Sequence, residues 1–258
     1  MEYRAIKLWI RNDVAVITLR RPEVMNALNT QMRAEITHAV KAAEAEARVV
    51  VMTGQGKSFC SGQDLGDGGS AASLDLERTL RDEYVPMLRA IVDCKIPTIA
   101  AVNGPAAGAG ANLALAFDVV IASDAAYFVQ AFTRIGLIPD AGGTHFLPRQ
   151  IGSARAMGAA LFADKISAQQ AADWGMIYEC VADDDFASRW QDRAAHLAAG
   201  PTVAYQHVKT ALRASSDNTF EQQLALEAKL QGKCGQTRDF QEGVVSFLQK
   251  RKPAYEGR

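Results

Sequence analysis

The sequence has almost no net charge and no long hydrophobic run. Its 28 Lys and Arg side chains nearly balance 29 Asp and Glu, which leaves a formal net charge of -1. A chain this close to neutral has no bulk attraction for nucleic acid, so we expect no nucleic-acid partner. The first residues carry no apolar signal core, and no run reaches membrane-spanning length. We therefore expect a cytoplasmic protein that does not enter a membrane.

Cysteine is scarce, and its spacing excludes the usual cysteine-based sites. The four cysteines are Cys60, Cys94, Cys180 and Cys234. They form neither a Cys-x-x-Cys pair nor any familiar metal-binding spacing. We expect reduced thiols and no metal site, with Cys60 as a small buried residue rather than a nucleophile.

What the chain does have is an apolar content of 48% in 258 residues, enough for a sizeable core. Strands and helices alternate through the first two thirds, which is typical of an α/β fold. The expected strands cover 6–10, 14–19, 49–53, 97–102, 118–122 and 126–129, and the expected helices 30–47, 74–93 and 111–116. From about residue 185 the pattern is helical, over 185–199, 203–214, 220–231 and 239–250. We divide the chain into an α/β core, residues 1–199, and a helical region, residues 200–258.

Two glycine-bearing segments, 59–65 (FCSGQDL) and 103–113 (NGPAAGAGANL), each follow an expected strand. A strand that ends in a tight glycine turn before a helix leaves main-chain N–H groups without partners. Two such turns facing each other would form an oxyanion hole. The glycine spacing fits neither a dinucleotide fingerprint nor a phosphate loop. Close packing of strand against helix is the structural alternative.

Asp140 is the candidate acid or base. It follows Pro139 and precedes a short expected helix through Phe146 and Leu147. Its apolar neighbours would raise its pKa, whereas the start of a helix would lower it. The residues alone leave two alternatives open, proton transfer and capping of the helix.

Taken together, these segments resemble the crotonase (enoyl-CoA hydratase/isomerase) superfamily over nearly the whole chain. The matching segments are 19–22 (LRRP), 26–29 (NALN), 59–65, 103–110, 136–144 (GLIPDAGGT), 172–177 (ADWGMI) and 242–253 (EGVVSFLQKRKP). The resemblance implies a spiral core of ββα units and C-terminal helices that build a homotrimer or a hexamer. It implies acyl-CoA thioester substrates and no separate cofactor, because coenzyme A is part of the substrate.

The resemblance also implies roles for individual residues. The main-chain N–H groups of Ser61 and Ala109 would bind the thioester oxygen, with Gly108 beside them. The expected contacts to coenzyme A are Val24, Ala27, Gln63, Asp64 and Leu65, and Phe247 and Lys250 would reach it from a neighbouring subunit. For Lys250 the alternative is a solvated helix end.

The departures from the family pattern point to one branch of it. The two glutamates of typical hydratases correspond to Asn112 and Phe132, neither of which can act as a base. A carboxylate stands instead at Asp140, the position that isomerases of the family use. We expect an isomerase of a ring-epoxidised phenylacetyl-CoA or of a 3-enoyl-CoA. Asn112 would hold the substrate, hold Asp140 or be structural, while Phe132 would contact the acyl group.

Three other functions stay open at this point. The first is an enoyl-CoA hydratase, and the second is an aryl-CoA dehalogenase with Asp140 as its nucleophile. The third is a non-catalytic scaffold that binds CoA esters.

Overall fold

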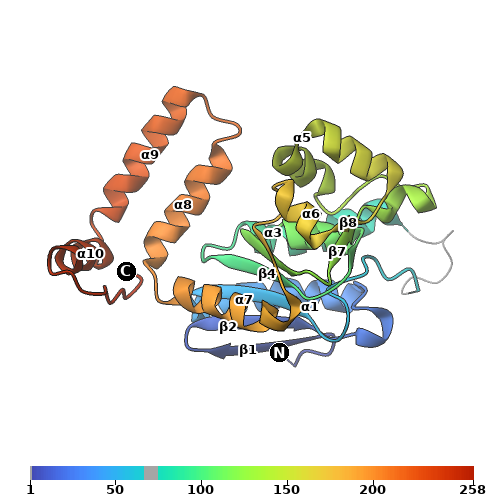
Figure 1. The fold of residues 1–258 in the computed structure, drawn as a ribbon, viewed down its shortest axis with the longest axis horizontal. Coiled ribbons are helices and arrows are strands. Elements are labelled where there is room, and N and C mark those ends of the chain that lie inside the picture. The colour runs from blue at the N-terminus through green and yellow to red at the C-terminus, as the bar shows by residue number, and fades with distance from the viewer. Residues whose placement is uncertain (1, 67–74) are drawn as a thin grey trace.

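A six-stranded sheet forms the centre of the computed structural model, which describes residues 2–66 and 75–258 (Figure 1). In spatial order its strands are β1 (Ile6–Arg11), β2 (Val14–Leu19), β3 (Val49–Gly54), β4 (Thr98–Val102), β6 (Val119–Ser123) and β9 (Glu179–Val181). β1 and β2 form an antiparallel hairpin, and every later pair is parallel. The α/β expectation is therefore confirmed.

Helices cover both faces of this sheet. Along β3, Val50 and Met52 pack in one core cluster with α1 (Thr30–Glu46). Val49 and Val51 face the opposite way and pack against α7 (Asp183–Ala198). This alternation follows from the two-residue period of a strand, and it explains why β3 is apolar throughout. The sheet is thereby buried between two helical layers.

A second, three-stranded sheet lies beside the glycine segments. Its strands are β5 (Ala106–Ala107), β7 (Tyr127–Val129) and β8 (Ile166–Ser167). β5 pairs with β7 in parallel, and β7 pairs with β8 antiparallel. These short strands join the second glycine turn to the region that carries Asp140.

The helix expected over 74–93 contains a π-helical segment rather than a kink at its proline. It is composed of α2 (Leu76–Thr79), a π-helical segment η3 (Leu80–Tyr84) and α3 (Val85–Val92). Pro86 lies in the first turn of α3, where its missing N–H does least harm. Position 74 lies outside the described residues.

The helix after Asp140 is much longer than expected. α5 spans Gly143–Phe162, with a non-helical residue at Gly152 and Pro148 inside. These two residues interrupt the helical pattern in the sequence, which is why only its first turn is predictable. The remaining elements of the core are η1 (Pro22–Val24), α4 (Ala109–Leu115), η4 (Ala131–Ile135) and α6 (Ala168–Asp173).

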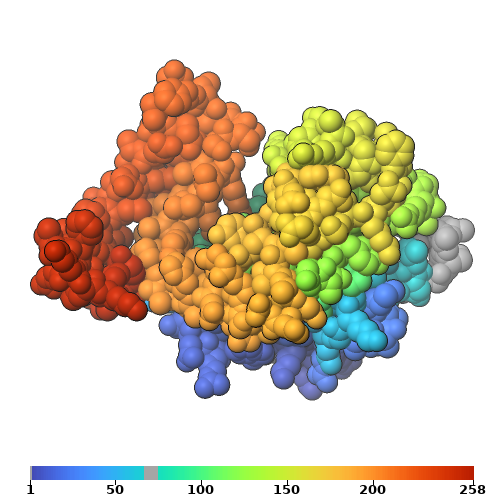
Figure 2. All heavy atoms as spheres, viewed as in Figure 1, coloured from blue at the N-terminus to red at the C-terminus, as the bar shows by residue number. Residues whose placement is uncertain are grey.

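Three C-terminal helices, α8 (Thr202–Ala214), α9 (Phe220–Cys234) and α10 (Arg238–Leu248), stand away from the core. Figure 2 shows a notch between them and the region of α5 and α6. α8 is tied to the core through Asp118, which accepts from Lys209 at 2.7 Å and from Arg213 at 2.6 Å. The change expected near residue 200 thus falls between α7 and α8, and a domain boundary there stays a prediction. Within the described ranges, no helix is both long and apolar enough to cross a bilayer.

Candidate active site

The two glycine-bearing segments lie side by side, as expected. Cys60 accepts a hydrogen bond from Ala107 N–H at 2.9 Å and donates its own N–H to Pro105 at 3.3 Å. A Cβ atom at Gly110 would lie 2.2 Å from the Cys60 carbonyl oxygen, and one at Gly62 would lie 2.8 Å from the Ala107 oxygen. Only glycine permits this approach, so the glycines serve to bring the two turns together.

The structure corrects the expected first donor. The N–H of Ser61 donates to the Met25 carbonyl oxygen at 3.0 Å, and its hydroxyl donates to Val24 at 3.1 Å. That N–H is therefore not available to a ligand. Sequence could not show this, because the acceptor lies 36 positions upstream.

The neighbouring N–H of Gln63 is free instead. Gln63 forms a parallel bridge with Leu28, in which Leu28 donates to Gly62 O at 2.7 Å and accepts from Asp64 N–H at 3.1 Å. In such a bridge the N–H of the central residue points to the opposite side. Within residues 2–66 and 75–258, it has no hydrogen-bond acceptor.

Ala109 presents a second free N–H. It is the first residue of α4 and follows Gly108, whose φ of 52° aims the chain into the helix. Its N–H has no partner among the described groups, as is usual in the first helical turn. Ala109 and Gln63 border the same cavity.

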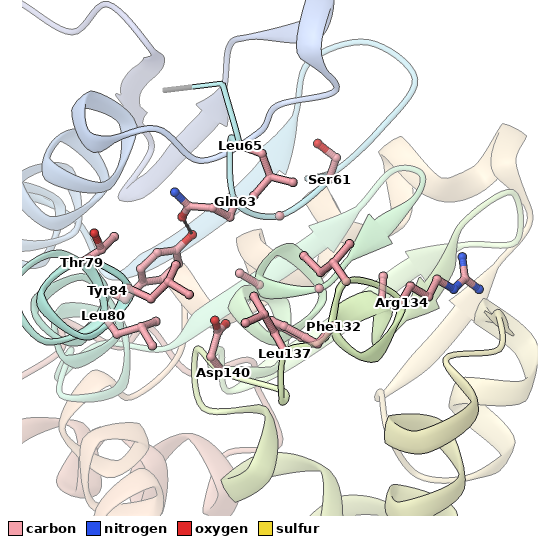
Figure 3. Close-up of a pocket in the computed structure, with 16 residues that line it drawn as sticks. Ser61, Gln63, Leu65, Thr79, Leu80, Tyr84, Phe132, Arg134, Leu137 and Asp140 are labelled. Carbon is pink, nitrogen blue, oxygen red and sulfur yellow. Dashed lines mark hydrogen bonds between the residues drawn. The ribbon is translucent and has the colours of Figure 1, made fainter. Parts of the chain in front are cut away.

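That cavity has a volume of about 280 Å³ and a mainly apolar wall (Figure 3). One side comes from the helical segment 76–84 and the other from η4 and the residues after it. Its described lining residues are Ser61, Gly62, Gln63, Leu65, Leu76, Thr79, Leu80, Tyr84, Gly108, Ala109, Ala131, Phe132, Arg134, Ile135, Leu137 and Asp140. Asp140 is the one carboxylate in this set.

Asp140 lies at the cavity with an unsatisfied carboxylate. Its Oδ1 atom is buried, and no donor from the described part of the chain reaches it. Burial raises the pKa of Asp140 to about 6, because desolvation disfavours the charged form. The N-cap of α5 is Gly142, so the Asp140 side chain does not cap that helix. The capping alternative is thereby removed, and proton transfer by Asp140 stays a prediction.

The main chain at Asp140 is held rigidly. Its carbonyl oxygen accepts from Asn112 Nδ2 at 2.7 Å and from Gly143 N–H at 2.9 Å. The next residue, Ala141, has a φ of 48°, a left-handed conformation that costs energy in a residue with a Cβ. The hydrogen bonds to its carbonyl oxygen and the left-handed Ala141 that follows therefore define the position of Asp140.

Asn112 is fully buried and does not line the cavity. Its Oδ1 accepts from Gln130 Nε2 at 2.9 Å, so Asn112 links Gln130 to the main chain of Asp140. Of the three readings of Asn112, the geometry matches a contact with Asp140. Gln130 was not anticipated, because nothing in the sequence relates it to a residue 18 positions away.

Two further residues contact the Gln63 side chain, and the sequence carries no signal for either. Tyr84 donates its hydroxyl to Gln63 Oε1 at 2.5 Å, and Arg33 donates to the same oxygen at 2.9 Å. Burial raises the pKa of Tyr84 above its usual value, so its hydroxyl stays protonated. Phe132 lines the cavity near Gly108, and its contact with an acyl group stays a prediction.

The expected coenzyme A residues are only partly at the cavity. Leu65 lines it and is 55% exposed, whereas the Asp64 carboxylate pairs with Arg21 at 2.8 Å. Val24 and Ala27 lie upstream of the Gln63 bridge and are not in the cavity wall.

Phe247 and Lys250 lie at the end of α10, on the arm that stands away from the core (Figure 1). One copy of the chain does not bring them to the cavity. Phe247 is 81% exposed. Their expected role in a neighbouring subunit's site stays a prediction.

The described residues include no cluster of metal-ligating side chains and no accessible thiol at the site. No group of three or more metal-ligating side chains occurs in residues 2–66 and 75–258. Cys60 is fully buried, and burial raises the pKa of its thiol to about 12. A protonated, inaccessible thiol is a poor nucleophile.

Comparison with known proteins shows which family the chain resembles. The family model for enoyl-CoA hydratase/isomerase matches residues 10–258. A probable enoyl-CoA hydratase of Rhodobacter capsulatus is 60% identical over 258 residues, the full length of both chains. The 1,2-epoxyphenylacetyl-CoA isomerase of Escherichia coli is 43% identical over 254 residues, covering 96% of this chain and 97% of that protein.

Solved structures agree. The crystal structure of a putative enoyl-CoA hydratase/isomerase from Mycobacterium abscessus has a TM-score of 0.94 and 39% identity. The match covers 98% of this chain and all of that one. With its paired glycine turns and its helical C-terminal region, this chain belongs to the enoyl-CoA hydratase/isomerase family of the crotonase superfamily.

Proposed function

We propose that the protein is an isomerase of CoA thioesters that works through a single carboxylate. The observation that carries the proposal is Asp140, the one acid among the described lining residues, with a buried and unpartnered Oδ1 atom. A carboxylate kept short of hydrogen bonds is a stronger proton acceptor than one in water.

In this mechanism the thioester oxygen is bound by the N–H groups of Gln63 and Ala109. Those donors stabilise the negative charge of an enolate, and one such donor commonly contributes a factor of roughly 10²–10³ in rate. Asp140 removes a proton from C2 of a 3-enoyl-CoA, and the double bond moves as the proton returns at C4. The product is the 2-enoyl isomer, and no atom is gained or lost.

For the substrate we propose the ring 1,2-epoxide of phenylacetyl-CoA, with 3-enoyl-CoA as the second substrate. Support comes from the name of the E. coli relative and from the apolar wall that includes Phe132 and Leu137. With the epoxide, the same N–H groups hold the thioester while the strained ring opens and expands to an oxepin. Apolar and aromatic walls of this kind suit an unsaturated ring.

Hydration of a 2-enoyl-CoA is the second candidate function. The R. capsulatus relative is named as a probable hydratase, and a 2,3-dehydroadipyl-CoA hydratase of E. coli is 36% identical. Against strong hydration stands Asn112, which is buried behind the cavity wall and bonded to Asp140. It leaves no second carboxylate there to position a water molecule.

A paired assay of wild type and Asp140→Asn tests the proposal. Each protein receives 1,2-epoxyphenylacetyl-CoA, a 3-enoyl-CoA and a 2-enoyl-CoA, and products are identified by mass and absorbance. We expect isomerisation in the wild type and a loss of at least about a hundredfold in the variant. Asp164→Asn, an exposed carboxylate beyond the end of α5, is the matched control. Efficient hydration that does not depend on Asp140 would overturn the isomerase assignment.

We also propose that the protein works as a trimer or hexamer in the cytoplasm. The apolar side chains on α8, α9 and α10 support assembly, because Leu212, Phe220 and Leu248 are 68%, 73% and 74% exposed. A second copy seated on them would carry Phe247 and Lys250 to a neighbouring cavity. Light scattering of the purified protein gives its mass directly, and a monomer at micromolar concentration would contradict the proposal.

A further inference from the structure

The side chain of Gln63 is tied down at one atom by two different helices. Its Oε1 accepts from the Tyr84 hydroxyl at 2.5 Å and from Arg33 Nη1 at 2.9 Å. An amide oxygen has two lone pairs, so both are used inside the protein. The side-chain oxygen of Gln63 is therefore fully engaged within the protein.

The two donors are themselves rigidly placed. Arg33, on α1, is 2% exposed and donates to Glu83 Oε2 at 2.6 and 3.0 Å and to Leu28 O at 2.6 Å. Its guanidinium lies 4.8 Å from the centre of the Tyr84 ring, and Tyr84 ends the π-helical segment. A buried arginine with this many partners fixes the position of each group that it contacts.

Leu28 holds the main chain on either side of Gln63, while Arg33 and Tyr84 hold its side chain. With both ends held, the direction of the Gln63 N–H is defined before any ligand arrives. Oxyanion stabilisation depends on such preorganisation, since donors that must reorient lose much of their effect.

Tyr84 also forms part of the cavity wall, opposite Phe132 and Leu137 in Figure 3. A group that binds in the cavity thus meets Tyr84 directly, and Tyr84 contacts Gln63. The Tyr84 hydroxyl thus connects this part of the cavity wall to the side chain of the residue that carries the N–H donor.

We propose that Tyr84 and Arg33 are positioning residues that aim the main-chain N–H of Gln63 at the thioester oxygen. The inference rests on the proposed function, because it assumes that this N–H binds the carbonyl. In this proposal the side chain of Gln63 also has a role: it is an anchor between α1 and the π-helical segment.

The test is Tyr84→Phe, which keeps the ring in the cavity wall and removes only the hydroxyl. The matched control is Tyr3→Phe, which removes a tyrosine hydrogen bond to His38 of 2.8 Å far from the cavity. The probe is phenylacetyl-CoA labelled with ¹³C at the thioester carbonyl, bound to each protein and observed by infrared difference spectroscopy. A carbonyl held by two donors absorbs at lower frequency than the free ester.

We expect a clear downshift in the wild type and in Tyr3→Phe, and a smaller one in Tyr84→Phe. In turnover, kcat of Tyr84→Phe should fall about fivefold, the effect of one hydrogen bond, with KM changed less than about twofold. Gln63→Met, which keeps the N–H and removes both anchors, should show the same loss in a stronger form.

Two outcomes would count against the inference, and they are distinguishable. A wild-type downshift that Tyr84→Phe and Gln63→Met both retain in full would overturn the positioning role and leave the proposed function intact. The absence of any downshift in the wild type would overturn the oxyanion site itself, and the positioning role with it.

Discussion

The side-chain amide of Asn112 donates a hydrogen bond of 2.7 Å to the main-chain carbonyl oxygen of Asp140. Asn112 thus contacts the main chain of Asp140, the candidate base, and not the Asp140 carboxylate. Its other end accepts from Gln130, so a buried pair of amides lies directly behind the base. We therefore expect the orientation of Asp140 to depend on this pair.

Replacing Asn112 with Leu keeps a side chain of similar size and removes the hydrogen bonds. We expect kcat to fall about tenfold and KM to change little, because the substrate does not touch Asn112. Stability should fall by roughly 2 kcal/mol, since the buried Gln130 Nε2 loses its acceptor and the Asp140 carbonyl loses one of its two donors. Steady-state kinetics and urea unfolding measure both effects, and an unchanged kcat would show that the orientation of Asp140 does not need Asn112.

The rate should depend on pH through Asp140. Its pKa of about 6 means that the carboxylate form, which accepts the proton, dominates above that value. We expect kcat/KM for the isomerisation to rise with pH through about 6 and then level off. A profile that stays flat from pH 5 to 8 would be incompatible with Asp140 as the base.

The same carboxylate should make the folded protein less stable at high pH. The folded pKa of Asp140 lies above its ordinary value of 3.8, so its stabilising contribution is complete below 3.8 and is lost as pH rises through about 6. Asp140→Asn should therefore be more stable than wild type at pH 8, by about 2 kcal/mol. Urea unfolding at pH 8 and pH 5 measures the difference, which should narrow at the lower pH. Equal stability at pH 8 would show that the buried charge costs nothing.

Two glycines of α5 should respond in opposite ways to alanine. A Cβ atom at Gly143 would lie 2.3 Å from Asn112 Nδ2, whereas nothing lies within 4 Å of one at Gly158. Gly143→Ala should displace the amide, lower kcat more than tenfold and destabilise the protein by about 2 kcal/mol. Gly158→Ala should keep full activity and gain about 0.5–1 kcal/mol, because alanine is the better helix former. Similar behaviour of the two variants would mean that the contact with Asn112 relaxes easily.

Lys250 gives a test of the proposed assembly. If α10 of a neighbouring copy reaches the coenzyme A phosphates, Lys250→Ala should weaken binding of phenylacetyl-CoA, and more so at low salt. Lys41→Ala, on the exposed side of α1, is the control for general charge effects. Calorimetry at two salt concentrations measures both, and unchanged affinity in Lys250→Ala would remove Lys250 from the ligand site.

Much of the fold is predictable because its signals are local. The strands β1 and β2, the helix α1 and the C-terminal helices all appear where the sequence indicates them. The long α5 and the π-helical segment before Pro86 do not, because each departs from a regular period. β9 is three residues long, and its pairing with β6 joins parts of the chain almost sixty positions apart.

The candidate site likewise has features with a local sequence signal and features without one. The facing glycine turns follow from strand, turn and helix patterns. The apolar neighbours of Asp140 indicate its burial but leave helix capping open, and only the family resemblance singles it out as a base. In the first turn, Met25 accepts from the Ser61 N–H, and Leu28 bonds the main chain on either side of Gln63. These two distant residues therefore decide which N–H group is free. The anchors of Gln63 and Asn112 lie 18 to 30 positions from them, and no local pattern connects residues at that separation.

The groups that would bind the thioester oxygen belong to the main chain, and this has a consequence for variation in the protein. No side-chain replacement deletes an N–H, apart from proline, so Ala109 can drift to other small residues without a chemical loss. The path of the main chain must instead be kept, and it depends on Gly62 and Gly110, which allow the two turns to touch. Harmful natural variants are therefore expected at Gly62 and Gly110 more than at the donor residues themselves.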